Sequence, residues 1–212
     1  MSSPDRDHHR PALFGGRQFE WIAGAEDPAA VMRAAHESAR TLLARTRGAE
    51  DPAVLERLVR YTDEHGIDAL AELWARAAPA SLPGALWRIH LLQAAIRQDP
   101  DGVSLLFQRG TEVLATADAA VAGAPSPAGP DEVVALADAL LRGAFSGDLA
   151  LALDRAASFA RLVASGAADV ADDQEAASPE RATLLTTRAL RFSAIADELA
   201  RCARMARDDA LD

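Results

Sequence analysis

The side chains best placed to contact a ligand lie on one stretch of this sequence, residues 82–98. Counting from His90, Gln93 follows after three residues and Arg97 after seven, which puts all three on one face of a helix. Most other residues of the stretch are apolar, so we expect a central helix with one polar stripe. The stripe is either a window to solvent or the lining of a ligand or partner cleft, and the sequence leaves both interpretations open.

Two arginines stand among apolar residues. Arg88 lies opposite the stripe, and Arg188 lies within an apolar seam spanning residues 185–206. An unpaired buried charge costs several kcal/mol, so we expect each arginine to pair with a carboxylate. For Arg188 the candidate partners are Glu72, Asp118 and Asp138. The alternative is an anion site that Arg88 and Arg188 form together.

The sequence patterns of common catalytic and cofactor sites do not occur. The chain has no Lys, which excludes a Walker-type phosphate loop and a Lys Schiff base. It also lacks His-Glu-x-x-His, Glu-x-x-His and Gly-x-Ser-x-Gly spacings, so we expect no metal and no cofactor. The single cysteine, Cys202, lies on the apolar seam and is interpreted as an inert core thiol. An enzyme stays open, because catalytic residues need no local signature.

Three aromatic residues follow a polar, proline-containing start of the chain: Phe14, Phe19 and Trp21. We expect residues 1–23 to form a flexible tail. The aromatic side chains either fold back onto the core or form a short docking motif for another protein.

Residues 24–212 predict a single domain of about eight helices, with one possible internal boundary at 122–130. The hexapeptide Gly-Ala-Glu-Asp-Pro-Ala occurs at 24–29 and 48–53, and in each copy Asp followed by Pro is typical of a helix start. Later starts are predicted at Asp68, Ser81, Asp101, Asp131, Asp148 and Ser178. Residues 166–177 are expected to be a mobile acidic loop.

The helix pattern also predicts how the helices pack. Short connections favour antiparallel hairpins stacked as a compact bundle, and the repeated hexapeptide leaves a short helical-repeat solenoid as the alternative. Gly110 interrupts an apolar line, which predicts a close helix crossing. The seam at 185–206 has alternating spacings of three and four, so it should pack along a helix of this chain or of a second copy.

Composition supports the all-α class and narrows the partners. Half of the 212 residues are hydrophobic but only 5% are aromatic, and the Ala and Leu that dominate favour helices over strands. A net charge of −10 argues against nucleic-acid binding. The start of the chain has no apolar signal-peptide core, and no run of 18 apolar residues occurs. We therefore expect a cytoplasmic protein with no membrane span.

Two stretches resemble an uncharacterised family of small helical proteins from GC-rich bacteria. They are residues 81–110, SLPGALWRIHLLQAAIRQDPDGVSLLFQRG, and residues 130–163 with the run Leu-Arg-Gly-Ala-Phe-Ser-Gly-Asp. The resemblance implies a helical fold in the bacterial cytosol and no particular activity. We expect a non-enzymatic interaction or adaptor protein that binds another protein or a second copy of itself. The alternative is a small-molecule-binding domain whose pocket uses Arg88, His90, Gln93, Arg97 and Arg188.

Overall fold

The computed structural model describes residues 28–44, 67–117 and 128–212, and these ranges form seven α-helices without strands. The helices are α1 (Pro28–Ala44), α3 (Ile67–Trp74), α4 (Leu82–Gln98), α5 (Pro100–Ala117), α6 (Pro130–Leu141), α7 (Leu149–Gln174) and α8 (Pro179–Arg207). The all-α bundle predicted from the sequence is therefore confirmed. Three predictions lie wholly or mostly outside the described residues: the tail with Phe14, Phe19 and Trp21, the helix after Asp51, and the boundary at 122–130.

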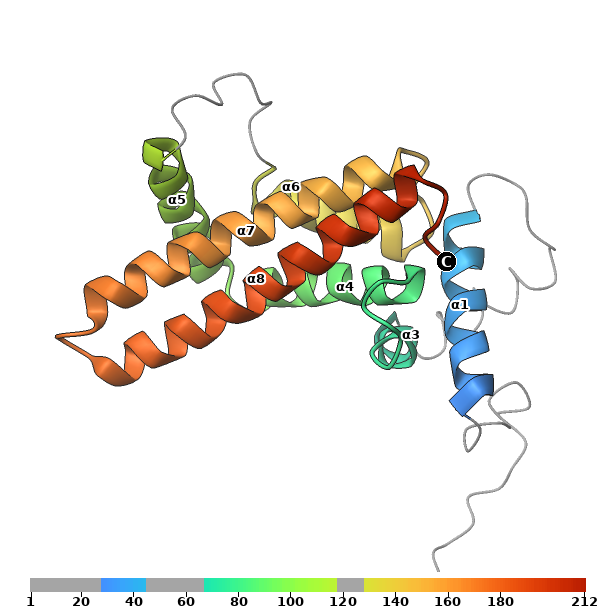
Figure 1. The fold of residues 1–212 in the computed structure, drawn as a ribbon, viewed down its shortest axis with the longest axis horizontal. Helices are drawn as coiled ribbons and strands as arrows, with labels where there is room; N and C mark the ends of the chain where they lie inside the picture. Colours follow the sequence, from blue (N-terminus) through green and yellow to red (C-terminus); the bar gives the residue numbers. More distant parts are fainter. Residues whose placement is uncertain (1–27, 45–66, 118–127) are drawn as a thin grey trace, which may run out of the picture.

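The two longest helices, α7 and α8, form an antiparallel hairpin that runs along the molecule (Figure 1). Helix α5 crosses α7, and α4 packs against α6 beside the hairpin. Helices α1 and α3 pack against α4 and against each other. Across the described ranges, no helix is long and apolar enough to cross a membrane.

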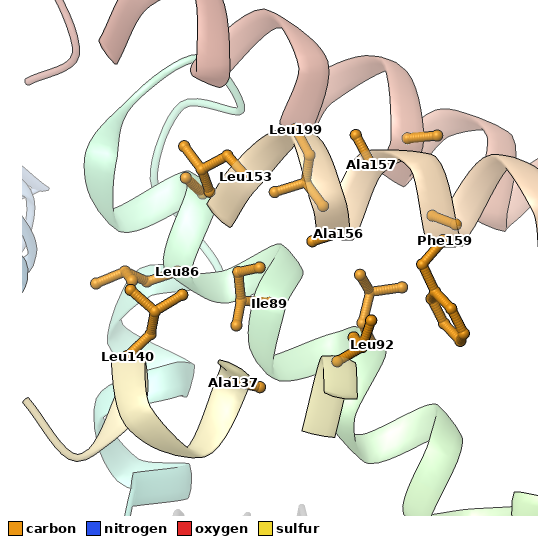
Figure 2. Packing of buried hydrophobic residues seen from close by; sticks show 14 of the residues in the cluster. Leu86, Ile89, Leu92, Ala137, Leu140, Leu153, Ala156, Ala157, Phe159 and Leu199 are labelled. Atoms are coloured by element: carbon orange, nitrogen blue, oxygen red, sulfur yellow. The ribbon is translucent and has the colours of Figure 1, made fainter. Parts of the chain in front are cut away.

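All seven helices contribute to one buried hydrophobic cluster. Figure 2 shows its centre, where Leu86, Ile89 and Leu92 of α4 meet side chains of α6, α7 and α8. The inner surface of α7 is rich in buried alanine, including Ala156 and Ala157, which lets neighbouring helices approach closely. The apolar seam of α8 packs along α7 within this chain, which decides between the two seam partners considered from the sequence.

Local residue types explain most of the helix starts. Ser81 caps α4 by accepting a hydrogen bond from the backbone N–H of Gly84, and Asp148 caps α7 by accepting one from Leu151. The expected caps of three other helices are wrong. Asp68 lies inside α3, which begins at Ile67. Asp99, not Asp101, caps α5 through the N–H of Gly102. Helix α6 begins after Gly129, not after Asp131.

The predicted mobile loop at 166–177 is wrong, because α7 continues to Gln174. Ala167 and Ala171 extend its buried face, and Asp169 and Asp173 pair with Arg109 of α5. The predicted close crossing at Gly110 is present. A side chain at Gly110 would overlap the backbone of Leu162 on α7, and one at Gly166 would overlap the backbone of Leu106 on α5.

Candidate functional site

The polar stripe of α4 meets one carboxylate of α6. The side-chain amide of Gln93 donates to Asp138 Oδ1 at 2.9 Å, and Arg97 Nη2 donates to the same oxygen at 2.8 Å. Gln93 is only 3% exposed, so Asp138 satisfies a buried polar group. Arg142, one turn further along α6, lies 3.5 Å from this oxygen. Asp138 therefore links α4 to α6. No residue spacing in the sequence identifies it as the partner of the stripe.

His90, the third stripe residue, lies on the side of α3 rather than beside Asp138. Its ring stacks on Trp87 with centroids 5.5 Å apart, and Nε2 lies 3.7 Å from Asp68 Oδ1. Nδ1 is buried without a hydrogen-bond partner among the described residues. Burial lowers the pKa of His90, and Arg97 lowers it further, while Asp68 raises it. The lowered pKa favours the neutral ring at pH 7, and His90 contacts Trp87 and Asp68 rather than Asp138.

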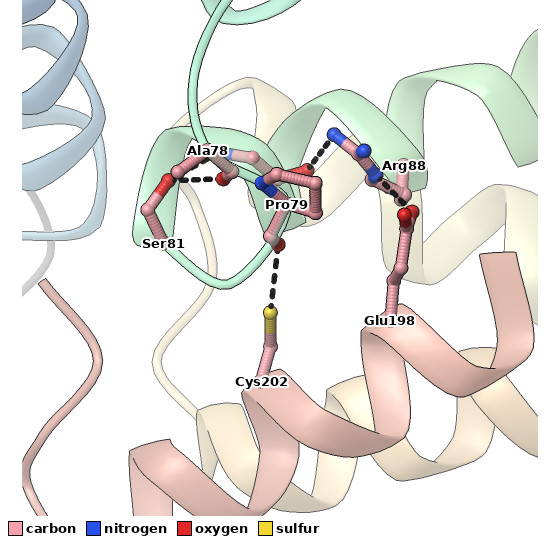
Figure 3. A network of polar contacts seen from close by, with 7 residues as sticks. Ala78, Pro79, Ser81, Arg88, Glu198 and Cys202 are labelled. Atoms are coloured by element: carbon pink, nitrogen blue, oxygen red, sulfur yellow. Dashed lines mark hydrogen bonds and ion pairs between the residues drawn. The ribbon is translucent and has the colours of Figure 1, made fainter. Parts of the chain in front are cut away.

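Arg88 forms hydrogen bonds at the junction of α4 and α8 (Figure 3). Its Nε donates to Glu198 Oε2 at 2.6 Å, and Nη1 donates to the carbonyl of Gly84 at 3.3 Å. The arginine side chain is 12% exposed and the glutamate side chain 31%. This is the structural ion pair expected for an arginine in apolar surroundings.

Arg188 also has a carboxylate partner, Asp99, which is not among the three expected; of those, Asp118 lies outside the described residues. Nη1 donates to Asp99 Oδ2 at 2.9 Å. Asp138, one of the expected partners, instead accepts a hydrogen bond from Gln93 of the stripe. The expectation failed because Asp99 follows the end of α4, where only the packing of α8 brings it near. Arg188 also lies 6.0 Å from the centroid of Phe192. The hydrogen bond from Arg188 is the main cause that lowers the pKa of Asp99, and the N–H of Gly102 adds to it while burial opposes it.

Together these contacts run along α4 and α8 in antiparallel order. Cys202 Sγ lies 3.3 Å from the carbonyl of Pro79, just before α4, and Arg88 and Asp99 follow with their own α8 partners. Glu198 and Arg188 are ten residues apart on α8, about 15 Å along the axis. The structure therefore gives each arginine its own carboxylate and does not bring the two arginines together as one anion site.

The thiol of Cys202 is fully buried, and burial raises its pKa. A thiol held in the protonated form is a poor nucleophile. In the described ranges no three His, Cys, Asp or Glu side chains are grouped as metal ligands.

A cavity of about 590 Å³ lies away from the stripe, between the C-terminal end of α1 and the N-terminal ends of α4 and α7. Its lining includes Leu43, Leu82, Leu149 and Leu211, with charges from Arg40, Asp148 and Asp209. Arg40 pairs with Asp212, whose main-chain oxygen accepts a hydrogen bond from the N–H of Leu82 at 2.8 Å. The volume falls in the range of ligand pockets, but none of the five predicted ligand residues lines it.

Besides the cavity, the sequence analysis missed the exposed face at the start of α8. Leu184 is 72% exposed and Leu190 is 67% exposed, more than the exposed leucines found on other described helices, Leu105 and Leu151. We define the α8 face as the exposed residues Glu180, Thr183, Leu184, Thr187, Leu190 and Arg191. The signal was present in the sequence, because Leu184 and Leu190 fall outside the seam that begins at Leu185.

The α8 face is less polar than its composition suggests. The hydroxyl of Thr183 donates to the carbonyl of Pro179, and that of Thr187 donates to the carbonyl of Thr183, each at 2.9 Å. These donors are satisfied within the helix, so covering them leaves no unpaired O–H.

The α8 face also extends past the body of the molecule. The ion pair of Arg188 with Asp99 marks the C-terminal end of α4, and α8 residues before Arg188 continue beyond it with α7 as their main neighbour. The end of the hairpin projects from the bundle (Figure 1).

Comparisons of the chain with protein-family models, curated proteins and solved structures found no match. The resemblance to a family of small helical proteins stays a prediction, and the function is argued from the residues alone.

Proposed function

We propose that this chain is a non-enzymatic helical interaction protein of the cytoplasm, which binds another protein or a second copy of itself through the α8 face. The observation that carries the proposal is the exposure of Leu184 and Leu190 on a projecting hairpin. Two large apolar side chains on one helix face lose contact with water when a partner covers them, which is the main driving force of protein association.

Four of the five residues considered for a ligand support this choice. Asp138 holds Gln93 and Arg97, Glu198 holds Arg88, and Asp99 holds Arg188. A ligand that used these groups would have to replace interhelical contacts of the fold. Among the described residues, a partner on the α8 face has no such interhelical contact to replace.

The test is affinity capture of tagged protein from lysate of its host, followed by quantitative mass spectrometry. Wild type is compared with Leu184→Ser/Leu190→Ser and with the matched variant Leu105→Ser/Leu151→Ser, which removes two exposed leucines elsewhere. We expect a stoichiometric partner, or an untagged copy of the chain, that only the α8 variant loses. Equal recovery with both variants, or no partner with wild type, would reject the proposal. A fourth sample lacking residues 1–23 tests whether Phe14, Phe19 and Trp21 add a second contact.

The cavity beside Leu82 supports a second candidate function, the binding of a small amphipathic molecule. Its lining is largely apolar with a few charges, which suits a ligand that has one polar end. Native mass spectrometry of protein purified from its host tests this directly. A constant added mass per chain supports the candidate, and a mass equal to the bare chain rejects it.

A further inference from the structure

We infer that the α8 face binds the α8 face of a second copy of this chain, antiparallel, in a two-fold symmetric dimer. The inference rests on the proposed function and names the partner. It comes from the order of residue types along the face, which is complementary to itself when reversed.

The apolar part of the face is symmetric about Thr187. Leu184 and Leu190 each lie three residues from it, about 4.5 Å along the helix axis. At about 100° per residue, Leu184 and Leu190 lie about 60° to either side of Thr187 around the helix. If a two-fold axis passes beside Thr187, the second helix lies over Thr187 and the two leucines border the contact on its two sides. Both exposed leucines of each protomer are then covered by the partner helix.

The charged residues of the face agree with the same orientation. Glu180 lies on the N-terminal side of the leucines and Arg191 on the C-terminal side. Reversal of the second helix brings each glutamate toward the arginine of the other protomer, with an axial offset of about 4.5 Å that an extended arginine side chain spans. A parallel arrangement would instead place like charges together. Neither residue forms an ion pair within the described part of the chain.

The remaining groups of the face raise no obstacle to a close approach. Thr183 and Thr187 use their hydroxyl donors inside the helix, so the contact buries no unsatisfied O–H. The hairpin end projects beyond α4, which gives a second hairpin room to lie alongside. One helix face is small for an interface, so we expect a dissociation constant in the micromolar range.

Sedimentation equilibrium of the full chain across a concentration series tests the dimer. We expect a mass of twice 22.4 kDa at high concentration and 22.4 kDa on dilution. Leu184→Ser/Leu190→Ser should raise the dissociation constant by about 100-fold or more. Leu105→Ser/Leu151→Ser should leave it unchanged. Circular dichroism checks that each variant keeps its helices.

Charge exchange tests the orientation. Glu180→Arg alone and Arg191→Glu alone should each raise the dissociation constant about fivefold, because each places like charges together. The double exchange should restore it to within about twofold, because both pairs re-form with opposite polarity. A dimer that weakens further in the double exchange would overturn the antiparallel arrangement.

Two outcomes separate this inference from the proposed function. A chain that stays monomeric at about 100 µM, yet captures a different protein that Leu184→Ser/Leu190→Ser loses, overturns the self-contact and leaves the interaction function standing. A monomer whose captured proteins are indifferent to the α8 variant overturns both. A dimer unaffected by the leucine changes overturns the inference that the α8 face forms it.

Discussion

Gly110 of α5 and Gly166 of α7 lie backbone to backbone where these two helices cross. A Cβ on Gly110 would overlap the carbonyl oxygen of Leu162, and a Cβ on Gly166 would overlap that of Leu106. The absence of both side chains is therefore what lets α5 approach α7.

Gly110→Ala and Gly166→Ala should each destabilise the protein by about 1–3 kcal/mol. Alanine favours a helix over glycine by about 1 kcal/mol, so a net loss means that the crossing outweighs helix propensity. Chemical denaturation measures the change. Ser165→Ala, one residue away, is the control and should be close to neutral. An increase in stability for both glycine variants would show that the helices separate at little cost.

Asp138→Ala should lower the free energy of unfolding by about 1–3 kcal/mol, because it leaves the buried amide of Gln93 without an acceptor. Asp138→Asn keeps one side-chain oxygen and should cost less. Adding Gln93→Leu to Asp138→Ala should recover part of the loss, since the unsatisfied amide is then gone. Strictly additive losses in this double-mutant cycle would show that the two side chains are not coupled.

Arg88→Ala should lower the melting temperature, because it removes a largely buried cation and leaves Glu198 unpaired. The expected loss is about 1–3 kcal/mol, less than for a fully buried pair because the glutamate is partly exposed. Arg201→Ala removes an exposed arginine from α8 and serves as the control. An unchanged melting temperature for Arg88→Ala would contradict the role given to this pair.

His90 should make stability depend on pH below 6.5. Its pKa is lowered from 6.5, chiefly by burial, so the unfolded chain takes up a proton at higher pH than the folded chain. The contribution of His90 to the free energy of unfolding is therefore fully present above pH 6.5. It decreases as the pH drops below that value, and it stops decreasing below the pKa of the folded state. Melting temperatures between about pH 7.5 and 5.5 should fall more for wild type than for His90→Gln. An equal change of melting temperature with pH in wild type and His90→Gln would mean that the ring titrates as it does in water.

The sequence indicates local features of this fold better than contacts between distant segments. Ser81 and Asp148 act as helix caps through backbone groups three residues away, which local spacing reveals. The close crossing at Gly110 followed from a glycine in an apolar line. The sequence predicts a loop at its counterpart Gly166, because the acidic residues that follow are typical of a loop, whereas buried alanines continue α7 there.

The candidate site shows the same limit. The need of Arg188 for a carboxylate was visible in the sequence, but the partner is Asp99, 89 residues away. Among several acidic residues, only the packing of α8 on α4 determines which one is near. Leu184 and Leu190 could have been found, since leucines outside a helix's buried seam indicate an exposed apolar face.

The most direct test of the central claim, that the α8 face is covered by its own copy, is disulfide crosslinking of Thr187→Cys. The proposed two-fold axis passes beside this residue, so the two introduced thiols lie close together, whereas the native Cys202 is buried. Mild oxidation should convert Thr187→Cys into a covalent dimer, and the exposed control Leu105→Cys should stay largely monomeric. A Thr187→Cys chain that crosslinks no more than the control, at concentrations above the measured dissociation constant, would contradict the account.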